Sequence, residues 1–454
     1  MNVSIIGTGY VGLTTGVCLA HLGHKVTCID SDEKKIAMLR AGKTPIYEPY
    51  LTELMADAQA NLRFCCNYAG AVNDAEVVFI AVGTPPSPDG SPDLCYLSQA
   101  ARGIGEHFNG DFVVVVNKST VPIGSGNWVD SLMRESYEQH HGKKANGHFC
   151  VASNPEFLRE GTALHDSLYA DRVVVGSDDP RALKVLYSLY RPILDQTFTP
   201  PTYLPRPEGV GAVPLISTDL ASAELIKYAA NAFLALKISY INEISQLSEK
   251  VGADITQVAK GIGLDARIGT RFLQAGIGWG GSCFGKDTSA LVSTAKEYSL
   301  TMPIVEAARE INRRQRERVV EKLLGELKIL KGRTIGLLGL AFKPNTDDLR
   351  EAPAIDIARK LLDRGCKVRV HDPVAMERFQ QEYGSMGAIC CDSAEAVADE
   401  ADALVLVTEW QQYRELDWEA LAERMHSRIV LDGRNALDRS RLSRFGFRYV
   451  GIAG

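Results

Sequence analysis

Three glycines near the beginning of the chain limit its possible folds more than any other part of the sequence. Gly7, Gly9 and Gly12 directly follow the apolar run VSIIG and open a helical pattern. The first glycine allows a tight turn, the second lets backbone approach a pyrophosphate, and the third permits close packing of helix on strand. The next apolar run ends in Asp30, whose carboxylate can accept a hydrogen bond from a ribose 2′-hydroxyl. The sequence therefore predicts a dinucleotide site, and the charge of Asp30 favours NAD over NADP.

Short apolar runs alternate with helical patterns in two series along the chain. Such runs, bounded by turn residues, predict parallel strands covered by helices on both faces of a sheet. The first series comprises residues 3–7, 26–30, 77–83, 112–120, 149–153 and 172–177. The second comprises residues 334–340, 367–373, 403–410 and 428–435, with helices expected near 353–364, 394–400 and 417–425.

The segment between the two series predicts a long helix. A Pro- and Gly-rich stretch at 199–214 interrupts all periodicity and is expected to be a loop or linker. Residues 218–251 lack proline and are rich in helix formers, with Thr218 or Asp219 as the N-cap and Gly252 as the C-terminal cap. A helix of this length either links two domains and packs against another subunit, or lies buried within one chain.

We therefore expect an α/β protein with two Rossmann-like doubly wound domains joined by a long central helix. The predicted divisions are residues 1–214 for an NAD-binding domain, 215–320 for a central helical and dimerisation domain, and 321–454 for a C-terminal domain. The C-terminal domain keeps Gly336 and Gly339 but lacks the full glycine pattern, which suits a mononucleotide better than a second dinucleotide.

Composition excludes several classes of protein. The 454 residues include 50 basic and 56 acidic side chains, so the net charge of -6 leaves no basic surplus for a nucleic acid. The apolar runs are too short to span a bilayer, and the N-terminus lacks the charged region and cleavage site of a signal peptide. The ten cysteines are scattered without a C-x-x-C pair, so we expect neither a disulfide framework nor a metal site. These features predict a soluble, cytoplasmic protein.

Cys283 differs from the other cysteines in its surroundings. It lies in the segment GWGGSCFGKD, where glycines precede it and Lys286 and Asp287 follow it. A nearby cation lowers the pKa of a thiol, and a carboxylate can orient a water or take a proton. The pattern indicates a nucleophile, and the alternative is a structural cysteine buried in a glycine turn.

Two further pairs of polar residues have helical spacing. Lys227 and Asn231 share one face of the expected long helix, with Glu224 one turn earlier. In its apolar surroundings Lys227 is either a surface lysine or a desolvated donor to a developing alkoxide. Glu156 and Glu160, in NPEFLREG, are expected on one helical turn, as either a solvated face or a general base and a substrate anchor.

Three residues near the predicted sheet edge are candidates for binding. Thr84 and Thr120 follow later runs of the first series, at the edge where such sheets bind ligands. Lys35 follows Asp30 and either lies over the adenosine or is a solvated surface lysine.

The segments GTGYVG, STVP, NPEFLREG, SAELIKYAANAFLA, RIGTRFLQAGIGWGGSCFGKD, GLAFKPNTDDLRE and TEW resemble, in this order, the UDP-glucose/GDP-mannose dehydrogenase family. The resemblance covers almost the whole chain. It implies an enzyme that oxidises the primary alcohol of a sugar nucleotide to a carboxylate with two NAD per turnover.

The resemblance also implies roles for the reacting residues. Cys283 matches the nucleophile that holds the aldehyde as a thiohemiacetal and then as a thioester, and Lys227 matches the lysine that stabilises the oxyanion, with Asn231 beside it. Asp287 and Thr120 match the pair that holds a water for proton transfer. Glu156 matches the glutamate that assists thioester hydrolysis.

The binding residues implied by the resemblance form two sets. Those for NAD are Gly7, Gly9, Tyr10, Val11, Gly12, Asp30, Lys35, Thr84, Thr120, Glu160 and Lys286. Those for the sugar nucleotide are Glu156, Phe157, Leu158, Lys227, Asn231, Arg267, Phe272, Gly280, Phe342, Lys343 and Arg434, and Arg267 is expected to reach the site from a neighbouring subunit of a homodimer or a larger assembly.

Two residues or segments depart from the family pattern. Gly285 stands where many relatives have proline or glutamine, and the 199–214 segment is longer than usual. UDP-glucose is the substrate that the resemblance favours, and GDP-mannose and N-acetylated UDP-sugars are the alternatives within the family. A single-step NAD-dependent hydroxyacid dehydrogenase and a non-catalytic NAD-responsive binding protein are alternatives of other classes.

Overall fold

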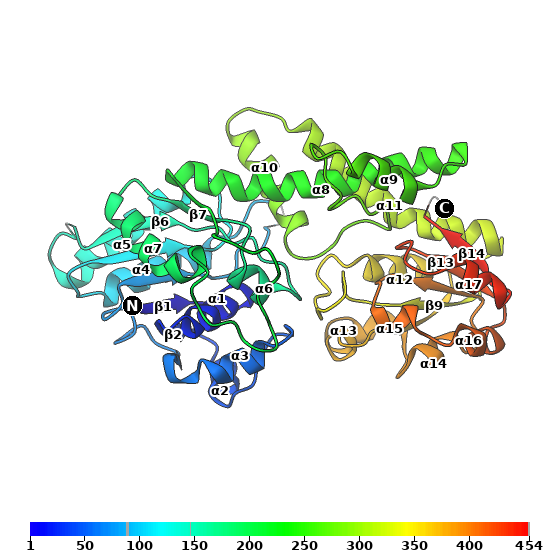
Figure 1. Ribbon diagram of the computed structural model, residues 1–454, viewed down its shortest axis with the longest axis horizontal. Coiled ribbons are helices and arrows are strands. Elements are labelled where there is room, and N and C mark those ends of the chain that lie inside the picture. The colour runs from blue at the N-terminus through cyan, green and yellow to red at the C-terminus, as the bar shows by residue number, and fades with distance from the viewer. Residues whose placement is uncertain (88–89, 146, 453–454) are drawn as a thin grey trace. The chain divides into compact units, whose positions relative to one another are not determined.

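The computed structural model describes residues 1–87, 90–145 and 147–452. The chain forms two compact units. The first unit contains residues 1–230 and 289–298, and the second contains residues 231–288 and 299–454. Each unit is built on one sheet of mainly parallel strands with helices on both faces, as predicted (Figure 1).

The first sheet has eight strands in the order β3-β2-β1-β4-β5-β6-β7-β8. The strands are β1 (Asn2–Ile6), β2 (Lys25–Ile29), β3 (Leu62–Cys65), β4 (Val77–Ile80), β5 (Val113–Asn117), β6 (Phe149–Ser153), β7 (Val173–Gly176) and β8 (Leu215–Thr218). Every residue of β4, β5, β6 and β7 is buried, as expected of strands covered on both faces. The strands from β1 to β6 are parallel, whereas β7 meets β6 in antiparallel orientation.

Helices cover both faces of this sheet and bury two apolar clusters against it. They are α1 (Tyr10–His21), α2 (Glu33–Arg40), α3 (Leu51–Asp57), α4 (Cys95–His107), α5 (Ser125–His141), α6 (Ala163–Leu168) and α7 (Pro180–Leu194), with a 3₁₀ turn at Gln59–Asn61. The edge strands β3 and β8 were missed by the sequence prediction because β3 has one buried residue and β8 has none, so neither forms a continuous apolar run.

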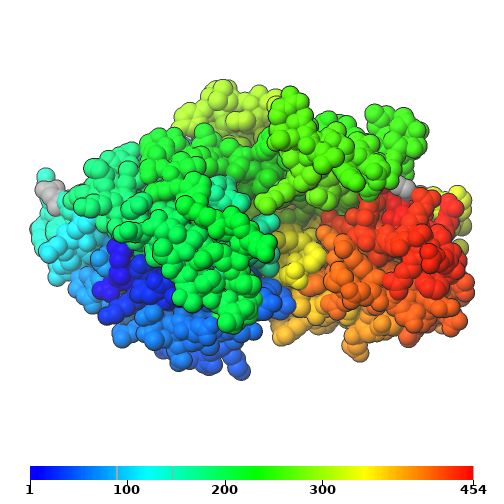
Figure 2. All heavy atoms as spheres, viewed as in Figure 1, coloured from blue at the N-terminus to red at the C-terminus, as the bar shows by residue number. Residues whose placement is uncertain are grey.

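The Pro-rich segment at 199–214 has no helix or strand, in agreement with the prediction of a loop, but it is packed onto the first unit. The Tyr203 hydroxyl donates to Asp57 at 2.7 Å, and its ring stacks on Tyr50 at 5.5 Å between centroids. The Tyr169 hydroxyl donates to the Leu204 carbonyl at 2.8 Å. On the face drawn in Figure 2, this green segment overlies blue N-terminal residues. The segment therefore covers the apolar face beside α1, α3 and α6.

The second sheet has six parallel strands in the order β11-β10-β9-β12-β13-β14. They are β9 (Thr334–Leu338), β10 (Lys367–His371), β11 (Ile389–Cys390), β12 (Ala403–Leu406), β13 (Ile429–Asp432) and β14 (Arg448–Gly451). The four central strands were predicted, whereas the short edge strands β11 and β14 were not.

The helices of the second unit include the three predicted near the C-terminus. They are α9 (Ile255–Gly263), α11 (Pro303–Leu327), α12 (Pro353–Asp363), α13 (Met376–Tyr383), α14 (Ala394–Ala398), α15 (Gln411–Arg414), α16 (Trp418–Arg424) and α17 (Arg439–Arg444), with a 3₁₀ turn at Gly384–Met386. Two large apolar clusters lie on opposite faces of the sheet, and a smaller one joins α8 and α9.

The predicted long helix is α8 (Leu220–Val251), which links the two units. Asp219 caps it, because its carboxylate accepts from the Ser222 backbone N–H at 2.8 Å. Helix α10 (Phe284–Glu297) also contributes to both units. The three-part division at residues 214 and 320 stays a prediction. Within the described ranges, none of the helices combines the length and apolar character that a membrane crossing requires.

Candidate active site

The glycine turn after β1 has the geometry that the motif predicts. Gly7 has φ of +99°, and a Cβ there would lie 2.6 Å from the Ala81 carbonyl oxygen. A Cβ on Gly12 would lie 1.9 Å from the Gly7 carbonyl oxygen. A Cβ on Gly9, by contrast, would meet nothing within 4 Å. Gly7 and Gly12 are therefore required by the fold itself, and Gly9 faces open space at the start of α1, where a pyrophosphate fits.

Asp30 closes the same turn from the end of β2. Its carboxylate accepts from the Thr8 backbone N–H at 2.9 Å and from the Thr8 hydroxyl at 2.7 Å. Burial acts to raise its pKa, but hydrogen bonds from Thr8 and Asp32 outweigh burial, and the pKa of Asp30 is lowered. The positive charge of Lys35 acts in the same direction. Asp30 is thus held as an anion with an oxygen available for a sugar hydroxyl.

Tyr10 and Val11 face the protein. The Tyr10 hydroxyl contacts Glu48 and accepts from the Gly161 backbone N–H at 2.7 Å. The buried Glu48 carboxylate also accepts from the backbone N–H groups of Gly161 and Ala163. Val11 packs against the core of the first unit. These contacts tie the glycine turn to the loop that precedes α6.

Thr84 and Thr120 lie together at the carboxyl edge of the first sheet. The buried Thr84 hydroxyl donates to the Thr120 carbonyl at 2.8 Å. The hydroxyl of Ser119 donates to the Val82 carbonyl at 2.7 Å. The loops that follow β4 and β5 are therefore joined at this edge, where β4 is the direct neighbour of β1 and β5 is the next strand.

The segment NPEFLREG forms a loop, and the expectation that Glu156 and Glu160 lie on one helical turn is wrong. Asn-Pro begins an extended stretch, and helix α6 starts only at Ala163. Both carboxylates are buried, with exposed fractions of 7% and 8%, which also excludes a solvated face. The Leu158 backbone N–H donates to Glu156 at 2.9 Å and fixes its side chain inside the loop.

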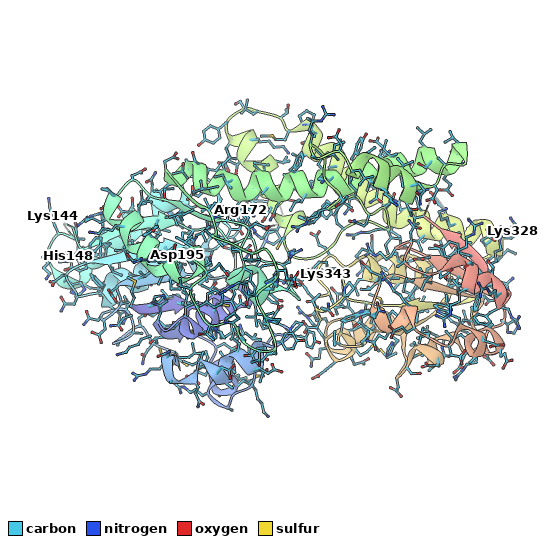
Figure 3. All side chains as sticks on the ribbon, viewed as in Figure 1. Lys144, His148, Arg172, Asp195, Lys328 and Lys343 are labelled. Carbon is cyan, nitrogen blue, oxygen red and sulfur yellow. The ribbon has the colours of Figure 1, made fainter. Side chains whose placement is uncertain are left out.

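Lys227 forms a buried ion pair with Glu156. The Lys227 ammonium donates to Glu156 Oε1 at 2.6 Å and to the Glu156 carbonyl at 2.7 Å. The centroid of the Phe157 ring lies 5.5 Å from this ammonium. The same ring is contacted by the guanidinium of Arg172, 3.7 Å from the centroid. Arg172 is labelled in Figure 3. Lys227 is 4% exposed, which excludes the alternative of a surface lysine, and its role as a donor to a developing alkoxide stays a prediction.

Glu224, one turn earlier on α8, holds the helix that follows the Thr120 loop. Its carboxylate accepts from the backbone N–H groups of Gly124 at 2.6 Å and Gly126 at 2.9 Å, at the start of α5. Burial raises the pKa of Glu224 to about 7, although the two backbone hydrogen bonds oppose the shift. Glu224 therefore anchors the loop that carries Thr120 to the helix that carries Lys227.

Lys118 and Asn154 were missed by sequence reasoning. Lys118, at the end of β5, is 8% exposed, and its ammonium donates to Asn154 Oδ1 at 2.9 Å. The Tyr190 hydroxyl donates to the same oxygen at 2.5 Å, and the Asn154 amide donates to the Val174 carbonyl at 2.7 Å. A signal did exist, because Asn117 and Lys118 directly follow four valines, and polar residues of this kind are unusual at the end of a buried strand.

Cys283 lies at the N-terminal end of α10, in the second unit. Its carbonyl accepts from the Asp287 backbone N–H at 2.8 Å, and its Sγ lies 3.7 Å from the Ser282 hydroxyl. A helix N-terminus favours an anion, so this position favours the thiolate. No disulfide links the ten cysteines, all of which lie within the described ranges.

The glycines before Cys283 are needed for close packing. Gly281, with φ of +86°, would bring a Cβ to 2.7 Å from the Phe342 ring. A Cβ on Gly280 would lie 2.5 Å from the backbone carbonyl oxygen of Glu351. A Cβ on Gly285 would lie 2.0 Å from the side-chain carboxylate of Glu351. The departure at Gly285 thus makes room for Glu351 beside the first turn of α10.

Asp287 is held by two neighbours in the same unit. It is 1% exposed and accepts from the Asn231 amide at 2.6 Å and from the Lys286 ammonium at 2.7 Å. The ion pair with Lys286 compensates its buried charge. Among the residues that the structure describes, no group of His, Cys, Asp or Glu side chains is arranged to hold a metal ion.

Arg434 links the carboxyl edge of the second sheet to the cysteine turn. Its guanidinium donates to the carbonyls of Val407 at 2.7 Å, Gly278 at 3.2 Å and Phe342 at 3.5 Å. Lys343, labelled in Figure 3, follows Phe342 in the loop after β9, with its ammonium 5.5 Å from the Phe342 ring centroid. These three predicted residues therefore lie together.

A cavity of ≈ 320 Å³ lies beside Arg434 in the second unit. This volume is at the lower end of the range for small-molecule sites. The lining comprises Ile255, Thr256, Ala259, Lys260, Thr270, Leu273, Gln274, Ala275, Arg434 and Asn435. Of these, only Arg434 was predicted, because the lining comes from three chain segments, 255–260, 270–275 and 434–435, that the fold brings together.

Arg267 and Phe272 lie apart from these contacts. The Arg267 side chain is 88% exposed and pairs with Asp265 at 2.6 Å. Phe272 has φ of +65°, and its ring lies 6.3 Å from that of Phe284. The contact of Arg267 with a site in a neighbouring subunit stays a prediction.

Comparisons with known proteins cover the whole chain. Residues 1–194 match the NAD-binding domain of the UDP-glucose/GDP-mannose dehydrogenase family, residues 221–314 its central domain, and residues 336–439 its UDP-binding domain. The chain is 43% identical to UDP-glucose 6-dehydrogenase TuaD of Bacillus subtilis, over 99% of this chain and 93% of the relative. It is 44% identical to the UDP-glucose 6-dehydrogenase of Rhizobium meliloti, over 100% and 99% of the two chains. The structure of a UDP-glucose dehydrogenase from Pyrobaculum islandicum is similar at a TM-score of 0.87 and 39% identity, over 99% and 97% of the two chains.

Proposed function

Because the chain belongs to the UDP-glucose/GDP-mannose dehydrogenase family, we propose that it oxidises UDP-glucose to UDP-glucuronate, with NAD as the oxidant. The observation that carries this proposal is the similarity along the full length to UDP-glucose 6-dehydrogenases, at identities above 40%. The buried Lys227–Glu156 pair and the thiol at the start of α10 supply the groups that such a reaction needs.

The residues of the first unit fit NAD. Gly9 leaves open space at the start of α1, and the Asp30 carboxylate is ionised at the end of β2. When bound, NAD accepts a hydride from the sugar carbon in each of two oxidations. Asp30 orients the adenosine ribose, and the backbone N–H groups at the start of α1 hold the pyrophosphate.

In the first oxidation the sugar's primary alcohol becomes an aldehyde. The alcohol must lose a proton as its hydride leaves, so negative charge develops on its oxygen. Lys227 stabilises that charge with its ammonium, and Asp287, held by Asn231, receives the proton through a water held with Thr120. The desolvated position of Lys227 strengthens its interaction with the oxygen.

Cys283 retains the aldehyde for the second oxidation. The thiolate adds to the carbonyl carbon and forms a thiohemiacetal, so the reactive aldehyde stays bound. Loss of a second hydride from that carbon gives a thioester. Water then attacks the thioester with the help of Glu156, which releases the carboxylate and regenerates the thiolate. The balance is RCH₂OH + 2 NAD⁺ + H₂O → RCOO⁻ + 2 NADH + 3 H⁺.

The test is a substrate panel with NADH stoichiometry. We expect about two NADH for each UDP-glucose consumed and UDP-glucuronate as the product. Cys283→Ser should abolish formation of the acid, whereas the exposed Cys66→Ser should leave turnover unchanged as the matched control. Turnover confined to GDP-mannose or to an N-acetylated UDP-sugar would reject the choice of substrate.

The same experiment separates the proposal from other classes. One NADH per substrate, unaffected by Cys283→Ser, would favour a single-step hydroxyacid dehydrogenase. Calorimetric binding of a sugar nucleotide with no turnover in excess NAD would favour a binding protein.

We also propose a homodimer that buries one face of α8. Phe233, Tyr240 and Leu247 recur at intervals of seven on α8, and their exposed fractions are 60%, 48% and 60%. An exposed apolar stripe of this kind suits helix-to-helix packing between subunits. The double substitution Phe233→Lys and Tyr240→Lys should reduce the mass in light scattering to that of a monomer.

A cytoplasmic location completes the proposal, because ten cysteines without a disulfide suit a reducing compartment.

A further inference from the structure

The Lys227–Glu156 pair has a second buried lysine as its neighbour. Lys118 lies at the end of β5 and is 8% exposed, and no carboxylate within the described ranges forms an ion pair with it. Its ammonium donates to a neutral amide oxygen, that of Asn154. An ammonium buried without a paired anion costs free energy, so a structural explanation by local stability alone is unsatisfactory.

Asn154 connects Lys118 to the catalytic loop. Its backbone N–H donates to the Asn117 carbonyl at 3.0 Å, and its side chain is fixed by Lys118, Tyr190 and Val174. Asn154 precedes Pro155 and Glu156, so its position sets where the loop delivers the Glu156 carboxylate. The fixed chain of contacts runs from Lys118 through Asn154 to the ion pair with Lys227.

The charges of this cluster explain why a second lysine is useful. A Lys227–Glu156 pair alone carries no net charge, so the carboxylate offsets part of the attraction of the ammonium for a nearby oxyanion. With Lys118 ionised, the cluster carries one surplus positive charge, which an oxyanion in the substrate would neutralise. In a desolvated site this surplus acts with little screening.

We propose that Lys118 is a positioning residue, which fixes the Asn154–Glu156 turn and gives the Lys227–Glu156 pair the surplus positive charge that stabilises the substrate oxyanion. This inference rests on the roles of Lys227 and Glu156 in the proposed function. The sequence motifs that point to the family reaction do not require it.

The groups around Lys118 predict when its charge is lost. Burial lowers the pKa of Lys118 from 10.5 to about 8. Glu156 in the loop opposes this shift, Lys227 on α8 adds to it, and Cys18 on α1 opposes it weakly. Tyr190 on α7 reaches Asn154 and keeps its proton, because burial raises its pKa. Lys118 is therefore charged below pH 8 and becomes neutral above it, while Lys227 keeps its carboxylate partner.

The experiment compares Lys118→Met, Lys118→Arg and the exposed Lys184→Met of α7 in the full-length protein. We expect Lys118→Met to lower kcat about tenfold or more with KM for UDP-glucose changed less than about threefold, because the lost interaction belongs to the transition state. The kcat of wild type should fall above about pH 8, because Lys118 loses its proton there. The pH profile of Lys118→Met should lack this decrease. Lys118→Arg should restore most of kcat and keep it above pH 8, because a guanidinium stays charged. Lys184→Met should match wild type.

A Lys118→Met enzyme with kcat within about threefold of wild type and the same pH profile would overturn the proposal. A lysine-detected NMR titration provides a readout that is independent of turnover and of how well each variant folds around substrate. The Lys118 signal should titrate near pH 8, move to higher pH in Lys227→Met and move to lower pH in Glu156→Gln. A signal that titrates above pH 10, or ignores both substitutions, would also overturn the proposal. Absence of turnover in the wild type, with the NMR shifts as expected, would reject the proposed function and keep the charged cluster.

Discussion

The two sheets share the order of their first six strands and differ at the positions where a dinucleotide would bind. In both, the first strand lies between the second and fourth, so each has the same crevice beside its first turn. After β1 the chain passes through the glycine turn and enters α1 at Tyr10. After β9 it runs through a long loop that carries Phe342 and Lys343 before α12 begins at Pro353.

The acid at the end of the second strand shows the difference most clearly. Asp30 accepts from Thr8 and keeps carboxylate capacity for a ligand. Asp372 occupies the corresponding place after β10 and is 1% exposed. Its oxygens accept from the backbone N–H groups of Leu340, Ala341, Val374 and Ala375 and from the indole of Trp410. Asp30 therefore remains available for a ribose, whereas the carboxylate of Asp372 is engaged in hydrogen bonds that stabilise the protein.

One topology thus supports two kinds of site, and the first turn and the acid decide which. In the second sheet the hydrogen bonds of Asp372 fix the turn after β9, and its oxygens are engaged by the protein itself. The long loop in its place brings Phe342 toward the cysteine turn and Arg434. This agrees with the match of residues 336–439 to a UDP-binding domain.

Substitution of the turn glycines should produce the largest difference between the sheets. Gly12→Ala should weaken NAD binding by about 100-fold or more, because its Cβ would collide with the Gly7 carbonyl oxygen. Gly9→Ala should leave the fold intact and weaken NAD binding about tenfold, because its Cβ meets only the ligand. Calorimetric titration with NAD and the midpoint of thermal unfolding measure both effects.

The matched control is Gly339, which follows β9 and has φ of +99°, like Gly7. Gly339→Ala should destabilise the second unit, since its Cβ would lie 2.4 Å from Thr408 Cβ. It should leave NAD affinity within about twofold of wild type. A loss of NAD binding equal to that of Gly12→Ala would break the comparison, because the two turns would then serve the same ligand.

Replacement of Asp372 or Asp30 by asparagine should have effects of intermediate size. The first substitution should lower stability, and the second should lower NAD affinity. Asp372→Asn should lower the free energy of unfolding by about 3 kcal/mol, since an amide cannot accept from all the N–H groups that converge there. Asp30→Asn should change stability little and weaken NAD binding about tenfold, because a ribose hydroxyl loses a charged acceptor. Urea unfolding and NAD titration of both variants provide the measurement. Equal effects of the two substitutions on NAD affinity would contradict the assignment.

Much of this contrast could be predicted from the sequence. The glycine turn, Asp30 and the central strands follow local rules, because continuous apolar runs and glycine spacing determine them residue by residue. Cys283 was predicted as the nucleophile from its neighbours in sequence, whereas the ion pair between Lys286 and Asp287 is visible only in the structure. The family was recognised on the same short segments.

The remainder depends on contacts between residues distant in sequence. Glu156 and Glu160 have helical spacing, yet Asn154 and Pro155 begin a loop, and the Asn154 side chain accepts a hydrogen bond from the distant Lys118. The hydrogen bonds of Asp372 require four backbone groups from two separate turns, which no motif reveals. Edge strands such as β14 lack a sequence signal, because strands open on one side need fewer apolar residues.

The smallest predicted effect concerns the pH dependence of stability. At Asp30 the hydrogen bonds outweigh burial and lower the pKa of the carboxyl group. The ionised Asp30 therefore stabilises the folded protein above the pKa of the unfolded chain, about 3.9. This stabilisation is lost as pH falls through the pKa of the folded protein. At Asp432, after β13, burial outweighs the hydrogen bonds from Leu437, Arg434 and Tyr449 and raises the pKa. Its contribution is therefore present below about pH 3.9 and is lost as pH rises through the folded pKa.

The free energy of unfolding of wild type, minus that of Asp30→Asn, should thus increase with pH between about 3 and 5. The same difference for Asp432→Asn should decrease with pH over its own range. Trp128 lies in the first unit, and Trp279, Trp410 and Trp418 lie in the second, so variants that keep the tryptophans of one unit allow fluorescence to follow that unit separately. Slopes of the same sign would mean that Asp432 is held as an anion like Asp30, and the second sheet would then keep a charged acceptor at its edge after all.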